Sequence, residues 1–386
     1  MMSLSHKRKI CFISSSRADY DLLFPIMICF KKSKNFEFQI LVTGSHLESE
    51  HGKTVNKILK DGFQIDKKIK IEVNTNKSSD INKSLGNSII KISNALEALK
   101  PDLVFLLGDR FEIFGAAQAA MILGIPIAHM CGGDNAMGTY DNLIRHSISK
   151  MSSIHFVTNM DSKRRVIQLG EDPKRVFNHG STCVENIKSL NYLSKNILEK
   201  KLNIRFKNNI FVCTYHPLTI KKYNWKEEFL NLMSVLEDYK DTSIIFTKAN
   251  ADEGGKFINI YLEKQCKKIN HFYLFDSLGK EIYLNLLKQS SLAIGNSSSL
   301  IYEAPYLKTP SVDIGMRQKT RLSSSSVFRA NSSAISIRKQ IDNALKFKFK
   351  KIEYFYGNGN SSEKIYKTIS AIKNFKELIS EEFYEV

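Results

Sequence analysis

The 386-residue sequence lacks the marks of a disulfide-bonded or zinc-binding protein. Its six cysteines are far apart and form no CxxC pair, and most of them lie inside apolar runs such as KICFIS and IFVCTY. This pattern excludes a disulfide scaffold and a cysteine zinc site, and it is typical of buried free thiols in a reducing compartment.

Long apolar stretches are absent as well. No run approaches the ~18 residues of a membrane-spanning helix, and the N-terminal MMSLSHKRKICFIS has no apolar signal-peptide core. We therefore expect a soluble, cytoplasmic protein that does not act at a membrane.

The basic charge has no pattern typical of nucleic-acid binding. The formal net charge is +18, but the lysines are scattered and lack the interleaved aromatic residues of a base-stacking surface. The sequence does not favour a nucleic-acid partner. The charge still favours an anionic ligand, including a nucleotide.

Short apolar runs alternate with helical patterns along most of the chain, which predicts mostly parallel sheets covered by helices on both faces. The rhythm pauses in a helical, lysine-rich stretch at residues 185–208 and then restarts. We predict an α/β fold with two Rossmann-like, doubly wound domains that face a cleft. Their expected bounds are 1–188 and 189–364, with a C-terminal helix over 365–386 that packs back on the first domain. The expected strands cover 9–14, 37–44, 102–108, 126–130, 154–158 and 175–180, then 210–217, 242–250, 271–276, 291–298 and 310–315.

Ligands of such sheets lie beyond the carboxyl ends of the strands, so the residues there are the first candidates. In the first half, Arg17 follows a strand and could clamp phosphate, or it is an exposed turn arginine. His46 ends the next strand, and by itself it is either a substrate-binding residue or a structural histidine. Asp109 follows LVFLLG and is either a catalytic carboxylate or a helix cap.

The stretch IPIAHMCGGDNAMGTYDNLIRH combines a strand end, two glycines and two aspartates. Cys131 and Asp134 flank the glycine pair, which lets the backbone approach a ligand closely. Asp141 precedes a helical pattern, so it is either a catalytic acid or base or an N-cap.

In the second half, the clearest phosphate candidate is SLAIGNSSSLIYEAP. A strand ends in a glycine and a serine-rich turn opens a helix, which offers N–H groups and hydroxyls to a diphosphate; the alternative is an ordinary serine cap. It is not a P-loop, because no GxxxxGK[ST] occurs. Candidates here for nucleotide binding are Gly295, Asn296, Ser297, Ser298, Glu303 (for the ribose), Arg317 and Arg321, with His216 at another strand exit as a catalytic or phosphate-binding group.

Taken together, these motifs resemble the hydrolysing UDP-N-acetylglucosamine 2-epimerases of sialic-acid and legionaminic-acid precursor synthesis. The resemblance runs in order from residue 9 to about residue 325. It rests on the segments SSSRADYDLL, LVTGSHL, LGDRFE, AHMCGGD, NLIRHSISKMSSIHFVT, RVIQLGED, YHPLT, IGNSSSLIYEAP and GMRQKTR.

The resemblance implies a GT-B-like fold, no metal or other cofactor, and a homo-oligomer, either a dimer or a tetramer. The implied substrate is a UDP- or GDP-linked 2-acetamido sugar, which is released as the free manno-configured sugar by elimination and hydration. By motif, Asp109, Asp134 and Asp141 fall on the sugar side, and His216 is an acid or a phosphate contact. Arg17, Ser297, Ser298, Glu303 and Arg317 fall on the nucleotide side.

Two positions depart from the family pattern. Cys131 stands where many members have a glutamate, and Asn142 stands where a second acid usually follows Asp141. These differences favour an N,N'-diacetylbacillosamine-type or otherwise modified 2-acetamido sugar over plain UDP-N-acetylglucosamine. They also leave open a catalytically impaired nucleotide-sugar-binding protein, and the fold leaves open a GT-B glycosyltransferase.

Overall fold

The computed structural model describes residues 7–48, 53–71, 78–137, 140–218, 223–249, 254–379 and 382–385. The chain divides into two compact units. The first comprises Met1–Asp134, Asp141–Glu185 and Tyr356–Val386, and the second comprises Asn135–Tyr140 and Asn186–Phe355. The functional domain boundaries near residues 188 and 364 stay a prediction.

The first unit is built on a seven-stranded sheet in the order β3-β2-β1-β4-β5-β6-β7, and every pair of neighbouring strands is parallel. The order reverses between β1 and β4, as in doubly wound folds. The strands are β1 (Arg8–Ser14), β2 (Phe36–Thr43), β3 (Lys67–Ile69), β4 (Leu103–Leu107), β5 (Ile127–Met130), β6 (Ile154–Val157) and β7 (Val176–Asn178).

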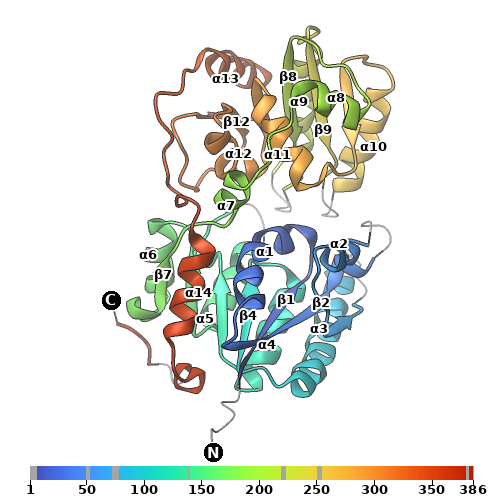
Figure 1. Ribbon diagram of the computed structural model, residues 1–386. Helices are drawn as coiled ribbons and strands as arrows, with labels where there is room; N and C mark the ends of the chain where they lie inside the picture. The colour runs from blue at the N-terminus through green and yellow to red at the C-terminus, as the bar shows by residue number, and fades with distance from the viewer. Residues whose placement is uncertain are drawn as a thin grey trace, which may run out of the picture. The chain divides into compact units, whose positions relative to one another are not determined.

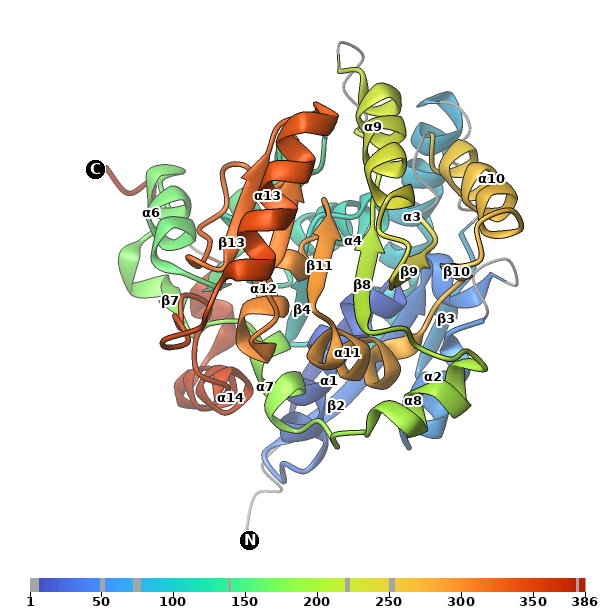
Figure 2. The same cartoon turned by 90° about the horizontal axis from the view of Figure 1, so that it is seen from above.

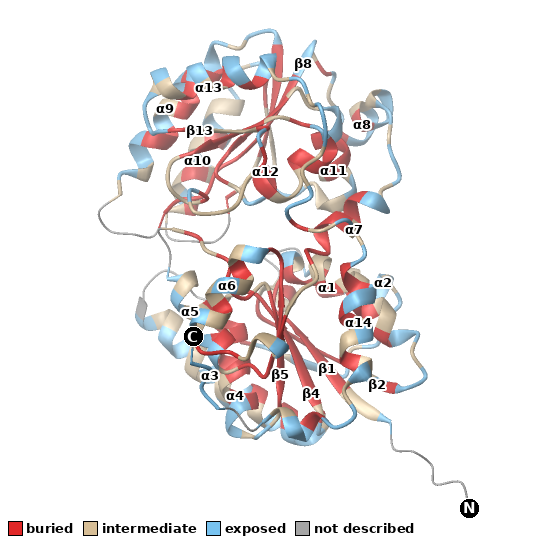
Figure 3. Cartoon of the chain, turned by 90° about the vertical axis from the view of Figure 1, so that its left-hand side faces the viewer, coloured by how far each residue is buried: buried red, intermediate tan, exposed pale blue. Residues whose placement is uncertain are grey.

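Helices cover both faces of this sheet because alternate side chains of a strand point to opposite faces. Ile10 and Phe12 of β1 pack in the cluster that includes α1 and α14, whereas Cys11 and Ile13 pack with α3 and α4. Strands β4 and β5 are buried along their whole length (Figure 3). The helices are α1 (Arg17–Lys31), α2 (Val55–Lys60), α3 (Ser78–Leu99), α4 (Phe111–Ile122), α5 (Asp141–Lys150), α6 (Met160–Gln168) and α14 (Ser361–Ala371), with 3-10 turns η1 (Gly44–Leu47), η2 (Pro173–Arg175) and η4 (Phe375–Leu378). Helix α7 (Cys183–Lys188) begins in the first unit and ends in the second.

The C-terminal segment returns to the first unit. Helix α14 packs against α1, and its Ile365 and Ile369 join the core on that face (Figure 1). The helix ends at Ala371, so the single helix expected over 365–386 is wrong in length. The chain turns there because the side chain of Asn374 caps the short η4 by accepting a hydrogen bond from the N–H of Lys376.

The second unit is built on a six-stranded parallel sheet in the order β10-β9-β8-β11-β12-β13. Figure 2 shows β8 and β11 running between α9 and α13 on one side and α11 and α12 on the other. The strands are β8 (Asn209–Thr214), β9 (Thr242–Thr247), β10 (Phe272–Phe275), β11 (Leu292–Gly295), β12 (Ser311–Ile314) and β13 (Val327–Ala330). The helices are α8 (Lys195–Leu202), α9 (Trp225–Glu237), α10 (Gly255–Cys266), α11 (Gly279–Gln289), α12 (Ser299–Tyr302) and α13 (Ala334–Lys346), with the 3-10 turn η3 (Ala304–Leu307).

The prediction of two Rossmann-like α/β domains is confirmed. The sequence patterns missed two strands, β3 and β13, which lie at sheet edges and keep at least half of their side chains partly exposed. Neither strand forms an apolar run, because two of the three residues of β3 are lysines and Arg329 interrupts β13. Across the described residues, each helix is too short or too polar to cross a membrane.

Candidate functional site

Four candidate residues of the first unit follow four neighbouring strands. Arg17 opens α1 after β1, His46 lies in η1 after β2, Asp109 follows β4, and Cys131 follows β5. The strands are parallel, so these exits share one edge of the sheet. The structure therefore gathers the first-unit candidates on the edge where ligands of this fold bind.

Asp109 is paired with an arginine that the sequence patterns did not single out. The guanidinium of Arg145, on α5, forms an ion pair with the Asp109 carboxylate. The Arg145 side chain is only 5% exposed, and it also donates to the backbone oxygen of Asp134 (2.8 Å) and to Oδ1 of Asn142 (2.9 Å). The position of Arg145 four residues after Asp141, one helical turn, was the available signal.

His129 holds the turn that carries Asp109. Its Nε2 lies 2.9 Å from the backbone oxygen of Gly108, and its Nδ1 lies 3.1 Å from the Ser149 hydroxyl. Because a carbonyl only accepts, Nε2 carries the hydrogen and Nδ1 accepts from Ser149. Burial lowers the pKa of His129 to about 3, so the ring is neutral at pH 7 and serves to fix the backbone.

The glycine pair packs the loop against helices of its own unit. Cys131 and Gly133 both have positive φ, at 65° and 73°. A Cβ at Gly133 would lie 2.2 Å from the backbone oxygen of Ser162 on α6, so only glycine fits there. The close approach that the sequence attributes to a ligand is a contact with α6.

Asp134 is held inside the protein. It is 6% exposed, and its Oδ1 accepts hydrogen bonds from the hydroxyls of Thr158 (2.8 Å) and Ser162 (2.7 Å). A carboxylate held in this way fixes the loop to β6 and α6. Asp141 differs, because it is half-buried at the first residue of α5, one turn before Arg145.

His46 is also built into the interior. It is buried, with Nε2 2.9 Å from the Ser14 hydroxyl and Nδ1 2.8 Å from that of Thr54. Burial, with a smaller contribution from Arg110, lowers its pKa to about 4. Its partners make His46 a support for the β1 and β2 exits. Arg17 is half-buried beside the Ser16 cap of α1.

In the second unit, the exits of β8 and β11 are joined closely. Gly295 has φ 132°, and a Cβ there would lie 2.0 Å from the backbone oxygen of Thr214. The side chain of Asn296 accepts from the N–H of His216 (2.7 Å) and donates to the oxygen of His216 (2.8 Å). Burial, and then the charge of Arg317, lower the pKa of His216 to about 3. The ring is therefore neutral at pH 7 in the free protein.

The serine turn opens a much shorter helix than the sequence predicts. Helix α12 begins at Ser299 and has four residues, and Glu303 lies at its end rather than within it. Pro305 in the following 3-10 turn cannot continue an α-helical ladder, which explains the break. Half-buried Ser297 and exposed Ser298 offer hydroxyls, whereas one helical turn contributes little dipole.

The loop after β12 carries the two candidate arginines. Arg317 donates to the backbone oxygen of Asn296 (3.3 Å), and Arg321 donates to that of Asn135 (3.0 Å). Residues Asn135–Tyr140 belong to the second unit, and the N–H of Met137 bonds to the oxygen of Arg317 (3.2 Å). The stretch that follows the glycine pair is thus paired with the arginine loop.

Asp313 of β12 was not among the site residues predicted from the sequence. It is 1% exposed, and within the described part of the chain neither of its carboxylate oxygens has a hydrogen-bond partner. Burial raises its pKa to about 7, and the charges of Arg329, Arg321 and Arg317 oppose that rise. Asp313 is the partner of Gly295 in the sheet register, at the ends of two neighbouring strands.

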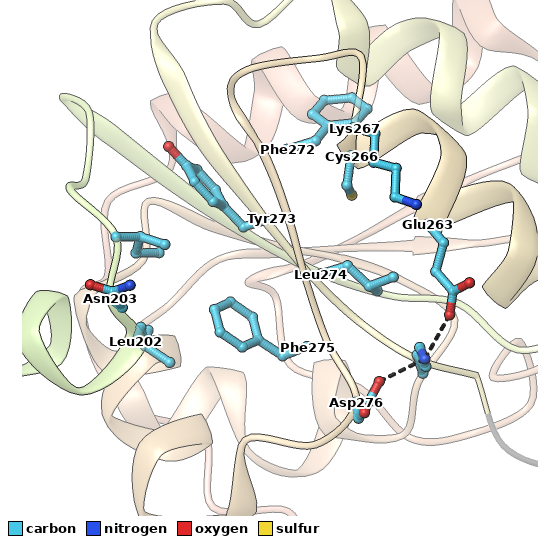
Figure 4. Close-up of a pocket in the computed structure, with 12 residues that line it drawn as sticks. Leu202, Asn203, Glu263, Cys266, Lys267, Phe272, Tyr273, Leu274, Phe275 and Asp276 are labelled. Atoms are coloured by element: carbon cyan, nitrogen blue, oxygen red, sulfur yellow. Dashed lines mark ion pairs between the residues drawn. The ribbon is translucent and has the colours of Figure 1, made fainter.

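A cavity on the second unit lies along the sheet-edge strand β10 and between α8 and α10 (Figure 4). Lys248 in this cavity pairs with Glu263 (2.8 Å) and Asp276 (2.7 Å). Its other lining residues come from 202–204, 266–267 and 272–275, so it is separate from the candidate residues at the exits of β8, β11 and β12.

Comparison with known proteins shows which family the chain resembles. Residues 29–370 match the family model described as UDP-N-acetylglucosamine 2-epimerase. The chain is 45% identical, over 82% of each chain, to the GDP/UDP-N,N'-diacetylbacillosamine 2-epimerase (hydrolyzing) of Campylobacter jejuni. It is 34% identical, over 98% of each, to the polysialic acid biosynthesis protein P7 of Escherichia coli. The crystal structure of UDP-GlcNAc 2-epimerase from Neisseria meningitidis bound to UDP-GlcNAc has the same fold, with a TM-score of 0.81 and 18% identity over 94% of this chain and 100% of that one.

Proposed function

Because the chain belongs to the UDP-N-acetylglucosamine 2-epimerase family, we propose that it is a hydrolysing nucleotide-sugar 2-epimerase. The reaction converts a nucleoside-diphosphate-linked 2-acetamido sugar and water into the free 2-epimeric sugar and the nucleoside diphosphate. The single observation that carries the proposal is the Asp109–Arg145 pair at the carboxyl edge of the first sheet, in a chain that matches this family over most of its length.

The chemistry requires one proton to leave carbon 2 and another to return on the opposite face. A base removes the proton from carbon 2 while the bond between carbon 1 and the diphosphate oxygen breaks, which leaves a double bond between carbons 1 and 2. Water then supplies a hydroxyl to carbon 1, and an acid delivers a proton to carbon 2. We assign the two proton-transfer roles to Asp109 and Asp141, with Arg145 orienting Asp109.

The departing diphosphate needs positive charge and hydrogen-bond donors. We assign this role to Arg17, Arg317 and Arg321 and to the hydroxyls of Ser297 and Ser298, with Glu303 accepting hydrogen bonds from the ribose. A neutral His216 donates one hydrogen bond to a phosphate oxygen, and its low pKa argues against imidazolium as the acid of the free protein.

The substrate class follows from the relatives and from Cys131. The Campylobacter jejuni relative is named for N,N'-diacetylbacillosamine linked to GDP or UDP, which supports the bacillosamine-type sugar that the Cys131 and Asn142 replacements favour. The name of the Escherichia coli relative supports a place in the supply of precursors for sialic acids. We extend this proposal to legionaminic acid. We further propose that the enzyme acts in the cytoplasm as a homo-oligomer.

The deciding experiment supplies UDP- and GDP-linked N,N'-diacetylbacillosamine and UDP-N-acetylglucosamine in deuterated water. We expect nucleoside diphosphate release, with deuterium at carbon 2 of a manno-configured product. Release without deuterium would exclude elimination, and release only with an acceptor would indicate a glycosyltransferase. Binding by calorimetry without turnover, and turnover gained by Cys131→Glu, would indicate an impaired nucleotide-sugar-binding protein.

A further inference from the structure

We infer that Asn296 positions His216 and does not itself bind the nucleotide, an inference that rests on the proposed function. The Asn296 side chain is 0% exposed, and both of its polar atoms are engaged by the backbone of His216. The two partners also fix the amide orientation, since the N–H of His216 requires an oxygen and its carbonyl requires an N–H. The second N–H of the amide is enclosed as well, because the residue is 0% exposed, so the side chain does not face a ligand.

The side-chain amide of Asn296 adds one pair of hydrogen bonds beyond the last backbone pair of β8 and β11. The register between β11 and β8 ends with Gly295 opposite Thr214, and the N–H of Asn296 bonds to the oxygen of Thr214 (3.1 Å). Beyond that point the main chains no longer pair, and the side-chain amide of Asn296, which has the donor and acceptor of a peptide group, pairs with His216 instead. The backbone of His216 is thereby held although it lies past the strand end.

The backbone of Asn296 ties a third strand exit to the same point. Its carbonyl oxygen accepts from Nε2 of Gln318 (2.9 Å) and from Nη1 of Arg317 (3.3 Å), both on the loop after β12. One residue thus sets the spacing between His216 and the arginine loop. A shift of about 1 Å in a reacting group can lower a rate on the order of 100-fold, so the consequence for His216 is measurable.

A double-mutant cycle separates positioning from direct contact. Wild type, Asn296→Ala, His216→Ala and the double variant are compared by kcat and KM for nucleoside diphosphate release. We expect Asn296→Ala to lower kcat by tenfold or more in the wild-type background and to have no further effect once His216 is alanine. Independent, multiplicative losses would overturn the inference, because a direct nucleotide contact acts whether or not the imidazole is present.

Asn285 provides a matched control in the same unit. It is 1% exposed, accepts from the N–H of Leu193 (2.7 Å) and donates to the oxygens of Asn191 (3.1 Å) and Glu281 (2.9 Å). We expect Asn285→Ala to lower the melting temperature about as much as Asn296→Ala but to leave kcat unchanged. If kcat falls equally in the two variants, Asn296 contributes only to the general stability of the protein.

The affinities of the same four proteins for UDP and GDP are also measured by calorimetry, which needs no turnover. A wild type that turns over no nucleotide sugar refutes the proposed function, whereas coupled losses of affinity in the cycle still support positioning. Where Asn296→Ala does not fold, Asn296→Ser takes its place, because serine adds no charge and its shorter side chain cannot pair with both the N–H and the carbonyl of His216. Independent effects of Asn296→Ser and His216→Ala would again overturn the inference.

Discussion

Asp109 and Arg145 form an ion pair that joins the exit of β4 to helix α5, and the Asp109 side chain in it is 25% exposed while that of Arg145 is 5% exposed. The pair holds a carboxylate at the ligand-binding edge of the sheet while keeping it accessible. A base that must remove a weakly acidic proton needs this fixed orientation.

Replacing Asp109 tests its proton-transfer role. We expect Asp109→Asn to lower kcat by about 100-fold or more, as for loss of a general acid or base, with a smaller effect on KM. Asp102→Asn is the matched control, since Asp102 flanks the other end of β4 and accepts from the N–H of Lys9 (2.7 Å). Asp102→Asn should change stability and leave kcat within a few-fold of wild type. Similar kcat losses in both variants, measured by nucleoside diphosphate release, would contradict the role.

The two aspartates that follow the glycine pair, Asp134 and Asp141, should respond differently to substitution. Asp134→Asn keeps the Oδ1 acceptor for Thr158 and Ser162, so we expect kcat to stay within about tenfold of wild type. Asp134→Ala removes the acceptor to which both hydroxyls donate and should lower the free energy of unfolding by about 1–3 kcal/mol. Urea unfolding measures the second effect.

Asp141→Asn should instead lower kcat by about 100-fold with little change in stability, because Asp141 is half-buried at a helix start. If Asp134→Asn proves the more damaging of the two in the steady-state assay, the proton-transfer assignment passes to Asp134.

The sequence predicts the architecture well because buried parallel strands form short apolar runs that alternate with helical patterns. Eleven such runs locate strands, whereas β3, with two lysines in three residues, and β13, with Arg329 among four, form no apolar run. The strand exits also identify Asp109 and His216. The partners of these residues cannot be read from the sequence, since Arg145 pairs with Asp109 only once α5 has packed on the sheet.

Burial explains the remaining differences between the site predicted from the sequence and the surroundings of its residues in the structure. His46 and Asp134 have the residue types of a catalytic site, but the fold surrounds them with hydroxyl groups. In the sequence, Asn296 belongs to a predicted phosphate-binding turn. In the structure, its side chain pairs with the backbone of His216. Asp313 shows no motif at all, because its environment is set by burial and by four charged residues that are separate in the chain, Arg329, Arg321, Glu228 and Arg317.

Gly295 allows two strand exits to approach each other. A Cβ there would lie 2.0 Å from the backbone oxygen of Thr214, which cannot move without breaking the sheet register. We expect Gly295→Ala to abolish UDP binding or folding. Gly279→Ala is the control, since Gly279 also has positive φ (67°) but nothing within 4 Å of the added atom. Gly279→Ala should lower the free energy of unfolding by only about 1 kcal/mol. Calorimetry and thermal unfolding of both variants check this, and equal losses would contradict the steric explanation.

Asp313 should make the stability of the protein fall as pH rises. Burial raises its pKa to about 7 in the folded state, against about 3.9 for an unfolded aspartate. Between these values the folded state holds a proton that the unfolded state has lost, so stability declines from about pH 4 to pH 7 and levels off above.

Asn does not titrate, so Asp313→Asn should remove this component, which is roughly 4 kcal/mol at most. The charged groups that act on the carboxyl group, Arg329, Arg321, Glu228 and Arg317, are unchanged in the variant. Urea unfolding at pH 5, 6, 7 and 8 measures the effect: the stability of the variant relative to wild type should increase with pH. A difference that stays constant across this range would show that Asp313 is ionised throughout, and that the arginines beside it outweigh the cost of its burial.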